Sequence, residues 1–212
     1  SRDDQGNVTL TVNQTGYIEP LITRFGLDGD EHKSVDTPMI EHSNEEDLEK
    51  KLNKTLESTS GRTVPDNEWL RQWAKDHSFP QIIGSLLHAM VHTRPDLAYC
   101  IAVLSRNMAP GRTKLYHYKA AYRALCYLKG TKHLGLVYCQ KKMHNMSSLV
   151  KASIEESIQN NNGEFVDYDK FLEAAVDASF ADCVESYRST SGFVVWFGGS
   201  PVEYECKRQG LV

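Results

Sequence analysis

Basic side chains and one aromatic side chain recur at helical spacing near the middle of the chain. The set consists of Arg112, Tyr116, Lys119 and Arg123, which follow one another at intervals of four, three and four residues. We call it the basic stripe. This spacing places them on one face of a helix, and Lys129 and Lys132 extend the positive charge. Cations displace counterions from a phosphate backbone, and an aromatic ring can stack on a base. The pattern suits weak, sequence-independent binding of a nucleic-acid backbone, whereas composition alone favours the alternative, a solvated helix face.

The stripe lies in an uneven charge distribution. The net charge of the 212 residues is −4, which argues against binding of nucleic acid through bulk charge. Between Asp28 and Glu57 there are ten acidic and four basic residues, whereas the 37 residues from Arg106 to Lys142 hold nine Lys or Arg and no carboxylate. This second block is the strongest electrostatic indication of a binding surface.

Other site chemistries find little support in the residue types. The five cysteines form no CxxC pair and the eight histidines are scattered, so we expect reduced, mostly buried thiols and no zinc or histidine metal site. Hydrophobic residues make up 40% of the chain, and no apolar run approaches the ~20 residues of a membrane span. We therefore expect a globular protein of a reducing, cytoplasmic compartment with no membrane partner.

The first 78 residues predict one strand, one helix and a long connection. Residues 8–12 alternate apolar and polar side chains, as in the second strand of a hairpin. A helix capped by Asn13 or Thr15 should run to Phe25 and end at Gly26. Residues 28–78 are acidic and poor in apolar side chains, which predicts a mostly flexible linker with at most one helix, near residues 45–56.

The remaining residues predict three helices and then strands. The first helix has an apolar face from Ile82 to Met90, and the second starts at a Thr93–Asp96 capping box and buries Leu97, Ile101, Leu104 and Met108. The third should run from about residue 113 to residue 129. Strands are expected at 134–138, 171–178, 192–197 and 202–206, with a polar insertion at 141–170. The fold class is therefore α+β, ending in an antiparallel meander.

Four short stretches resemble, in collinear order, the Pol polyproteins of copia-type retrotransposons. They are Tyr17-Ile18-Glu19 with Arg24-Phe25-Gly26, Thr93-Arg94-Pro95-Asp96-Leu97-Ala98-Tyr99, Tyr127-Leu128-Lys129-Gly130-Thr131, and Val176-Asp177-Ala178-Ser179-Phe180-Ala181-Asp182 with Arg188-Ser189-Thr190-Ser191-Gly192-Phe193. The acidic linker and the polar insertion match poorly. Ser179 and Phe180 also depart from the Asp and Trp that are frequent in the family.

The resemblance implies a domain order and one catalytic residue. Residues 1–27 would end the reverse-transcriptase palm and thumb, 28–78 would be the linker, 79–140 a three-helix connection, 141–170 the insertion, and 171–212 the start of an RNase H domain. Asp177 matches the first Mg²⁺-binding carboxylate of that nuclease. Two-metal hydrolysis needs several carboxylates, so the resemblance predicts that Asp177 alone neither holds Mg²⁺ tightly nor catalyses.

Two functions therefore stay open. One is a segment of an RNA-directed DNA polymerase and ribonuclease H that works only with the remaining polyprotein domains, in virus-like particles and then in the nucleus. The other is a non-catalytic remnant or domesticated module that keeps weak nucleic-acid or protein binding.

Overall fold

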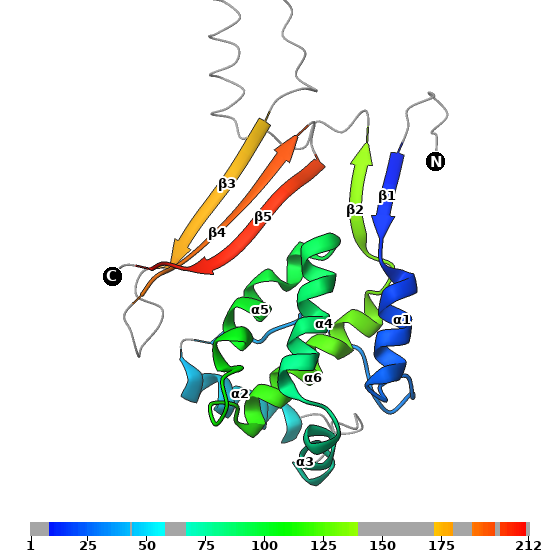
Figure 1. Cartoon of the computed structure of the whole chain (residues 1–212), viewed down its shortest axis with the longest axis vertical. Coiled ribbons are helices and arrows are strands. Elements are labelled where there is room, and N and C mark those ends of the chain that lie inside the picture. The colour runs from blue at the N-terminus through cyan, green and yellow to red at the C-terminus, as the bar shows by residue number, and fades with distance from the viewer. Residues whose placement is uncertain are drawn as a thin grey trace, which may run out of the picture. The chain divides into compact units, whose positions relative to one another are not determined.

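The computed structural model describes residues 9–42, 44–57, 67–139, 172–179, 188–197 and 200–210. Within these residues the chain combines six α-helices with two small antiparallel sheets, so the α+β class is confirmed. The chain divides into two compact units. Asn13–Gly135 makes up most of the helical unit, and the other unit holds most of the strand residues (Figure 1). The polar insertion expected at 141–170 lies outside the described residues.

The helical unit is built around its last helix, α6 (Leu115–Gly130). It is contacted by α1 (Thr15–Arg24), α2 (Glu45–Glu57), α3 (Asn67–Asp76), α4 (Phe79–His92) and α5 (Ala98–Leu104). In Figure 1, α6 runs behind α4. Buried alanines (Ala120, Ala121 and Ala124) allow close approach, and buried side chains lie on every side of α6. A helix buried all round belongs to a core rather than to a surface.

The first helix begins and ends close to its predicted bounds. Ile18, Leu21 and Ile22 form the buried face of α1, as its apolar spacing predicts. The N-cap is Gln14, with no side-chain cap, so the predicted cap at Asn13 or Thr15 is wrong. Asn13 Oδ1 instead accepts hydrogen bonds from the Thr15 backbone N–H and hydroxyl, at 3.2 and 3.0 Å. After the helix, Gly26 adopts a φ of 68°, which a residue without Cβ adopts at little cost. Gly26 therefore stops the helix as expected.

The described residues between 28 and 78 hold more helix than composition predicts. The charged helix expected at 45–56 is present as α2, but α3 is a second helix that the prediction lacks. Apolar side chains one turn apart anchor both helices, and the buried ones are Leu48, Leu52, Leu70 and Trp73. Trp73 also donates from Nε1 to the Phe25 carbonyl at 2.8 Å. Few apolar residues suffice in these two helices because the four named above point to the core.

The Thr93–Asp96 capping box does not form. Thr93 instead ends α4, and its hydroxyl donates to Gln14 Oε1 at 2.7 Å. The single helix expected after it is divided into η1 (Pro95–Leu97), α5 and η2 (Ser105–Asn107). Leu97, Ile101 and Leu104 are buried as predicted, whereas Met108 is 38% exposed because it follows the end of the helical segments.

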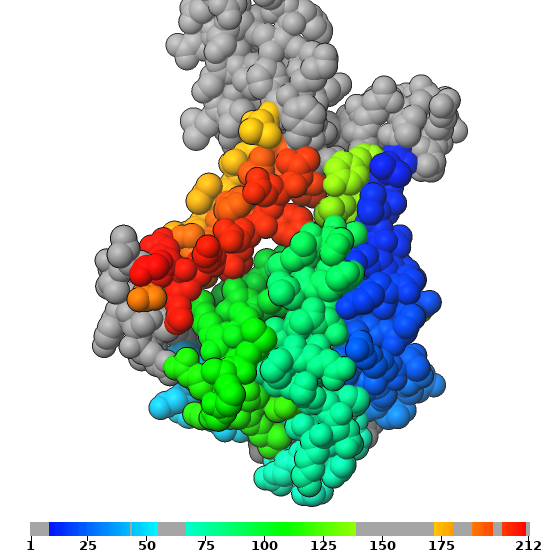
Figure 2. Space-filling view, in the orientation of Figure 1, coloured from blue at the N-terminus to red at the C-terminus, as the bar shows by residue number. Residues whose placement is uncertain are grey.

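The strands form two separate sheets. β1 (Thr9–Asn13) pairs with β2 (Gly135–Cys139), so the partner of β1 in the structure is a strand far along the sequence, and Figure 2 shows the two side by side. β3 (Leu172–Ser179), β4 (Thr190–Phe197) and β5 (Ser200–Arg208) form the second sheet in the order β3-β4-β5. These three strands lie in the sheet in the order of the sequence, as in the predicted meander. None of the helices in the described residues is long and apolar enough to cross a membrane.

Candidate functional site

Asp177, the predicted catalytic and metal-binding residue, lies on β3, the first strand of the three-stranded sheet. Its side chain is exposed. Alternation along a strand places Glu173 and Asp177 on the same face of the sheet. A carboxylate suits Mg²⁺, but one carboxylate does not make a two-metal centre. No group of three or more His, Cys, Asp or Glu side chains among the described residues could hold a metal ion, so metal binding by Asp177 stays a prediction.

The basic stripe is not an open helix face. Arg112 is exposed, but it precedes α6 and so is not part of the helix. Tyr116 and Lys119 are only 3% and 7% exposed, because the acidic helix α2 packs against this side of α6. Tyr116 and Lys119 therefore do not lie on an open helix face, and binding of nucleic acid by the four side chains stays a prediction. The alternative, a solvated face, is wrong for the same two residues.

Specific polar contacts join α2 to the stripe. The Tyr116 hydroxyl donates to Glu45 Oε2 at 2.6 Å, and Lys119 Nζ donates to Asn53 Oδ1. Burial raises the pKa of the Glu45 carboxyl, but the Tyr116 hydrogen bond and the neighbouring His117 outweigh it, so the pKa is lowered overall. Burial also lowers the pKa of Lys119. The acidic block of the sequence thus covers part of the basic block within one molecule.

Arg123 faces a different part of the same acidic segment. Its Nη2 donates to Thr37 Oγ1 at 2.8 Å. The Nε atom is buried and has no hydrogen-bond partner within the described part of the chain. Burial lowers the pKa of this guanidinium, although nearby thiols and Asp36 act in the opposite direction. Arg123 is therefore half-buried beneath the loop before α2 rather than turned to solvent.

The two lysines that extend the stripe also have partners in the chain. Lys129 Nζ donates to the carbonyls of Gly29, His32 and Asp28, at 2.6, 3.0 and 3.3 Å. These bonds hold the turn after α1 against the end of α6. Lys132 Nζ lies 2.6 Å from Glu19 Oε1, and both side chains are about half exposed, 46% and 52%. Of the six predicted nucleic-acid contacts, only Arg112 and Lys132 are exposed, and Lys132 is so by about half.

Two buried cysteines agree with the predicted reduced thiols. Cys100 and Cys126 are free and buried, whereas Cys206 is partly exposed. Burial raises the pKa of the Cys100 thiol to about 12 and that of Cys126 to about 11. The thiolate is the reactive form of cysteine, so neither thiol is suited to nucleophilic chemistry. The side chains of Cys139 and Cys183 lie outside the described part.

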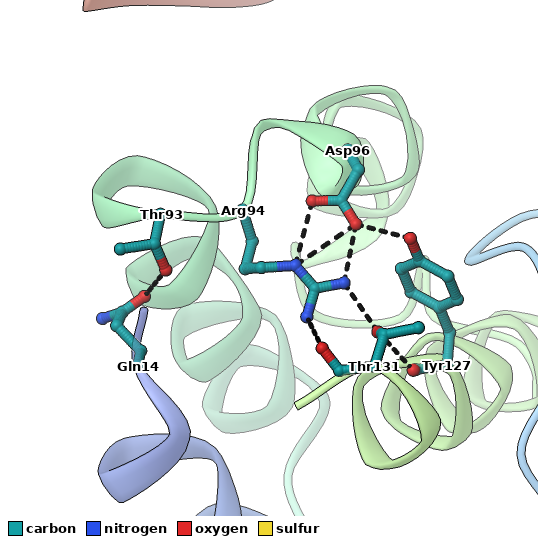
Figure 3. A network of polar contacts seen from close by, with 6 residues as sticks. All are labelled: Gln14, Thr93, Arg94, Asp96, Tyr127 and Thr131. Carbon is teal, nitrogen blue, oxygen red and sulfur yellow. Dashed lines mark hydrogen bonds and ion pairs between the residues drawn. The ribbon is translucent and has the colours of Figure 1, made fainter. Parts of the chain in front are cut away.

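A buried polar network is formed by the residues that follow Thr93, and the sequence analysis did not predict it. Arg94 is 1% exposed. Its guanidinium donates from Nε to Asp96 Oδ1 at 3.0 Å and from Nη2 to Asp96 Oδ2 at 2.7 Å. It also donates to the Thr131 carbonyl at 2.9 Å and the Thr131 hydroxyl at 2.7 Å, while the Tyr127 hydroxyl donates to Asp96 Oδ2 at 2.6 Å (Figure 3). We call these four residues the Arg94 clasp.

The clasp connects two of the stretches singled out in the sequence. Arg94 and Asp96 come from the segment after α4, and Tyr127 and Thr131 from the end of α6. The guanidinium carbon lies 5.2 Å from the centre of the Tyr127 ring, a cation–π distance. Arg94 also caps the last turn of α6 through the Thr131 carbonyl, where a positive charge is favoured by the helix dipole. The Arg-Pro-Asp and Tyr-Leu-Lys-Gly-Thr stretches are thus joined by one network of hydrogen bonds.

Comparison with known proteins agrees with the resemblance. The chain is 28% identical over 206 residues to the retrovirus-related Pol polyprotein from transposon TNT 1-94 of Nicotiana tabacum, an alignment that covers 96% of this chain and 12% of that protein. It is 30% identical over 200 residues to the Pol polyprotein from transposon RE2 of Arabidopsis thaliana, covering 94% and 10%. The chain thus spans about a tenth of these polyproteins.

A shorter relative is the secreted RxLR effector protein 161 of Plasmopara viticola. It is 31% identical over 139 residues, which cover 65% of this chain and 78% of the effector. Neither a protein-family model nor a solved structure matches the chain. Alignment to two transposon polyproteins over 94–96% of the chain, and to a third over 60%, shows the relationship: the chain belongs to the retrovirus-related Pol polyproteins of copia-type transposons.

Proposed function

We propose that this chain is the part of a copia-type Pol polyprotein that joins the reverse transcriptase to RNase H. The helical unit would be the connection, and β3, β4 and β5 would begin the nuclease sheet. The observation that carries the proposal is the position of Asp177: it is exposed on the first of three sequential antiparallel strands, where the family resemblance predicts the first metal-binding carboxylate. The alignment to transposon polyproteins over 94–96% of the chain supports it.

The chain's own residues limit what this segment does alone. Asp177 supplies one oxygen ligand, and Mg²⁺ bound by the complete nuclease would activate water and stabilise the leaving oxygen. Among the described residues, no group of three or more His, Cys, Asp or Glu side chains could hold a metal ion. We therefore propose a non-catalytic role for the 212 residues by themselves, with catalysis reserved for a longer polyprotein.

A cleavage assay tests the proposal. The 212 residues should not cleave an RNA/DNA hybrid in Mg²⁺, whereas a polypeptide continued through the nuclease region of a copia-type relative should. Asp177→Asn should abolish that activity, and Glu173→Gln, on the same face of the same strand, should leave most of it. Cleavage by the extended Asp177→Asn protein at the parental rate would overturn the assignment of Asp177.

Nucleic-acid binding through the basic stripe requires a rearrangement in this account. Tyr116 and Lys119 are bonded to α2, and Leu48 and Leu52 hold α2 in the core. Duplex binding by the stripe would therefore require α2 to leave α6. We propose that α6 primarily stabilises the fold, so that the 212 residues bind a duplex weakly and Lys119→Glu changes stability more than duplex affinity.

A second candidate function has one specific observation in its favour. The effector of Plasmopara viticola is covered over 78% of its length, so a related chain also occurs outside a Pol polyprotein. The helical unit has a core of its own, as an independent module requires. Under this second proposal, the extended polypeptide described above would show no Asp177-dependent cleavage, while the 212 residues would still unfold cooperatively.

A further inference from the structure

Two histidines lie one turn apart near the end of α4. His88 and His92 are both exposed, and their ring centres are 4.3 Å apart with planes inclined by 31°. One side of α4 is at the surface (Figure 2). The sequence His88-Ala89-Met90-Val91-His92 corrects the expectation that the histidines are scattered singly. Side chains four residues apart share a helix face, and two histidines at this spacing can bind one metal ion.

The orientation of His92 suits a metal ligand. Its Nδ1 lies 2.8 Å from the carbonyl oxygen of His88. Because a carbonyl only accepts, Nδ1 must carry the proton, and the neutral ring then has its lone pair on Nε2. A backbone carbonyl that fixes the other ring nitrogen is the usual second contact of a metal-binding histidine.

His88 is held on its other side by α1. The Tyr17 ring centre lies 4.5 Å from that of His88, so the His88 ring lies between Tyr17 and His92. His88 Nδ1 is 3.5 Å from Gln14 Nε2, a long hydrogen bond. The Gln14 amide is oriented by Thr93, whose hydroxyl donates to Gln14 Oε1 (Figure 3). Metal binding at His88 Nε2 moves the ring proton to Nδ1 and gives up only this long bond.

We propose that His88 and His92 chelate one divalent transition-metal ion through their Nε2 atoms, with water in the remaining positions. Imidazole nitrogen favours Cu²⁺, Ni²⁺ and Zn²⁺, and the order of affinity places Cu²⁺ first. Mg²⁺ prefers oxygen ligands, so this site is distinct in chemistry and place from Asp177. No third His, Cys, Asp or Glu joins the pair in the described part of the chain, and the site is consequently open and exchangeable.

A metal ion at this pair would fix the last turn of α4. That turn leads through Thr93 directly into Arg94, the first residue of the Arg94 clasp. Unfolding separates the two imidazoles, so the ion binds the folded chain more tightly and stabilises it. The last turn of α4, Gln14 and the clasp would then form one continuous connection between α1, α4 and α6.

Calorimetric titration of the whole chain with CuCl₂ and NiCl₂ tests the proposal. We expect one ion per chain at this pair, with affinity at least tenfold lower in His88→Ala and in His92→Ala. The double variant should be no weaker than either single variant, because one imidazole cannot chelate. His133→Ala, which removes an exposed histidine elsewhere in the helical unit, should bind as the parent does.

Two further measurements separate chelation from loss of fold. Far-UV circular dichroism should be unchanged in all four histidine variants, since the side chains are exposed. Gln14→Glu should raise the affinity severalfold, because a carboxylate can accept the His88 Nδ1 proton. Affinity in His92→Ala equal to that of the parent would overturn the proposal, as would equal losses in His133→Ala and His92→Ala or an absence of binding in the parent.

Discussion

Replacement of Arg94 by Met tests the most heavily buried charge in the helical unit. The substitution removes the ion pair to Asp96 and both bonds to Thr131, and it keeps much of the side-chain volume. Breaking a buried ion pair by removing one partner costs about 3–5 kcal/mol. Asp96 is 33% exposed and keeps the Tyr127 hydroxyl, so water can replace part of the lost contacts. We therefore expect a loss of about 3 kcal/mol in the free energy of unfolding.

Urea unfolding followed by tryptophan fluorescence measures this loss, because Trp73 is buried in the same core. Lys132→Met is the matched control: it removes the cation from the half-exposed pair with Glu19, and such pairs contribute about 0–1 kcal/mol. The double variant Arg94→Met/Asp96→Asn should be less destabilised than the sum of the two single variants, because the partners are coupled. Equal losses in Arg94→Met and Lys132→Met would refute the reasoning.

Three further substitutions follow from the same structure. Lys119→Glu should lower the free energy of unfolding in urea by about 2 kcal/mol, because it buries a carboxylate beside α2. The control Arg112→Glu, at an exposed position, should change it by no more than about 0.5 kcal/mol. Equal effects of the two substitutions would contradict the packing of α2 on α6. Burial lowers the pKa of His117 to about 4, so the unfolded chain binds more protons between pH ~6.5 and ~4, and the free energy of unfolding should fall by up to about 3 kcal/mol as the pH is lowered over that range. His117→Gln should flatten this pH dependence, and an unchanged slope would count against it. Gly130→Ala would place Cβ 2.5 Å from Ser34 Cβ and should cost about 1–2 kcal/mol, which Ser34→Gly should recover if that contact is the cause.

Local patterns predicted most element positions. The apolar spacing of Ile18, Leu21 and Ile22, the stop at Gly26 and the end of α6 at Gly130 all appear in the structure. These features depend on residues that are close to one another in the chain, and the sequence shows such neighbours directly. The order of β3, β4 and β5 followed from short connections between consecutive strands.

Long-range pairing could not be predicted in the same way. The acidic composition of residues 28–57 suggested a flexible chain, yet Leu48 and Leu52 bury α2 against α6. The charge asymmetry contained the missing information, because an acidic segment and a basic helix attract each other. Neither block alone indicates whether its partner is nucleic acid or the other block. Likewise, Arg94 and Thr131 are 37 residues apart, and their contact depends on the crossing of two helices.

The account depends most directly on α2 being folded onto the basic stripe. Hydrogen exchange of the backbone amides in residues 48–54 and in α6 measures this in the whole chain. The account predicts that the two sets are protected to a similar degree and lose protection together in Leu48→Ala. Amides of residues 48–54 that exchange at the rate of an unfolded peptide, while those of α6 stay protected, would contradict it.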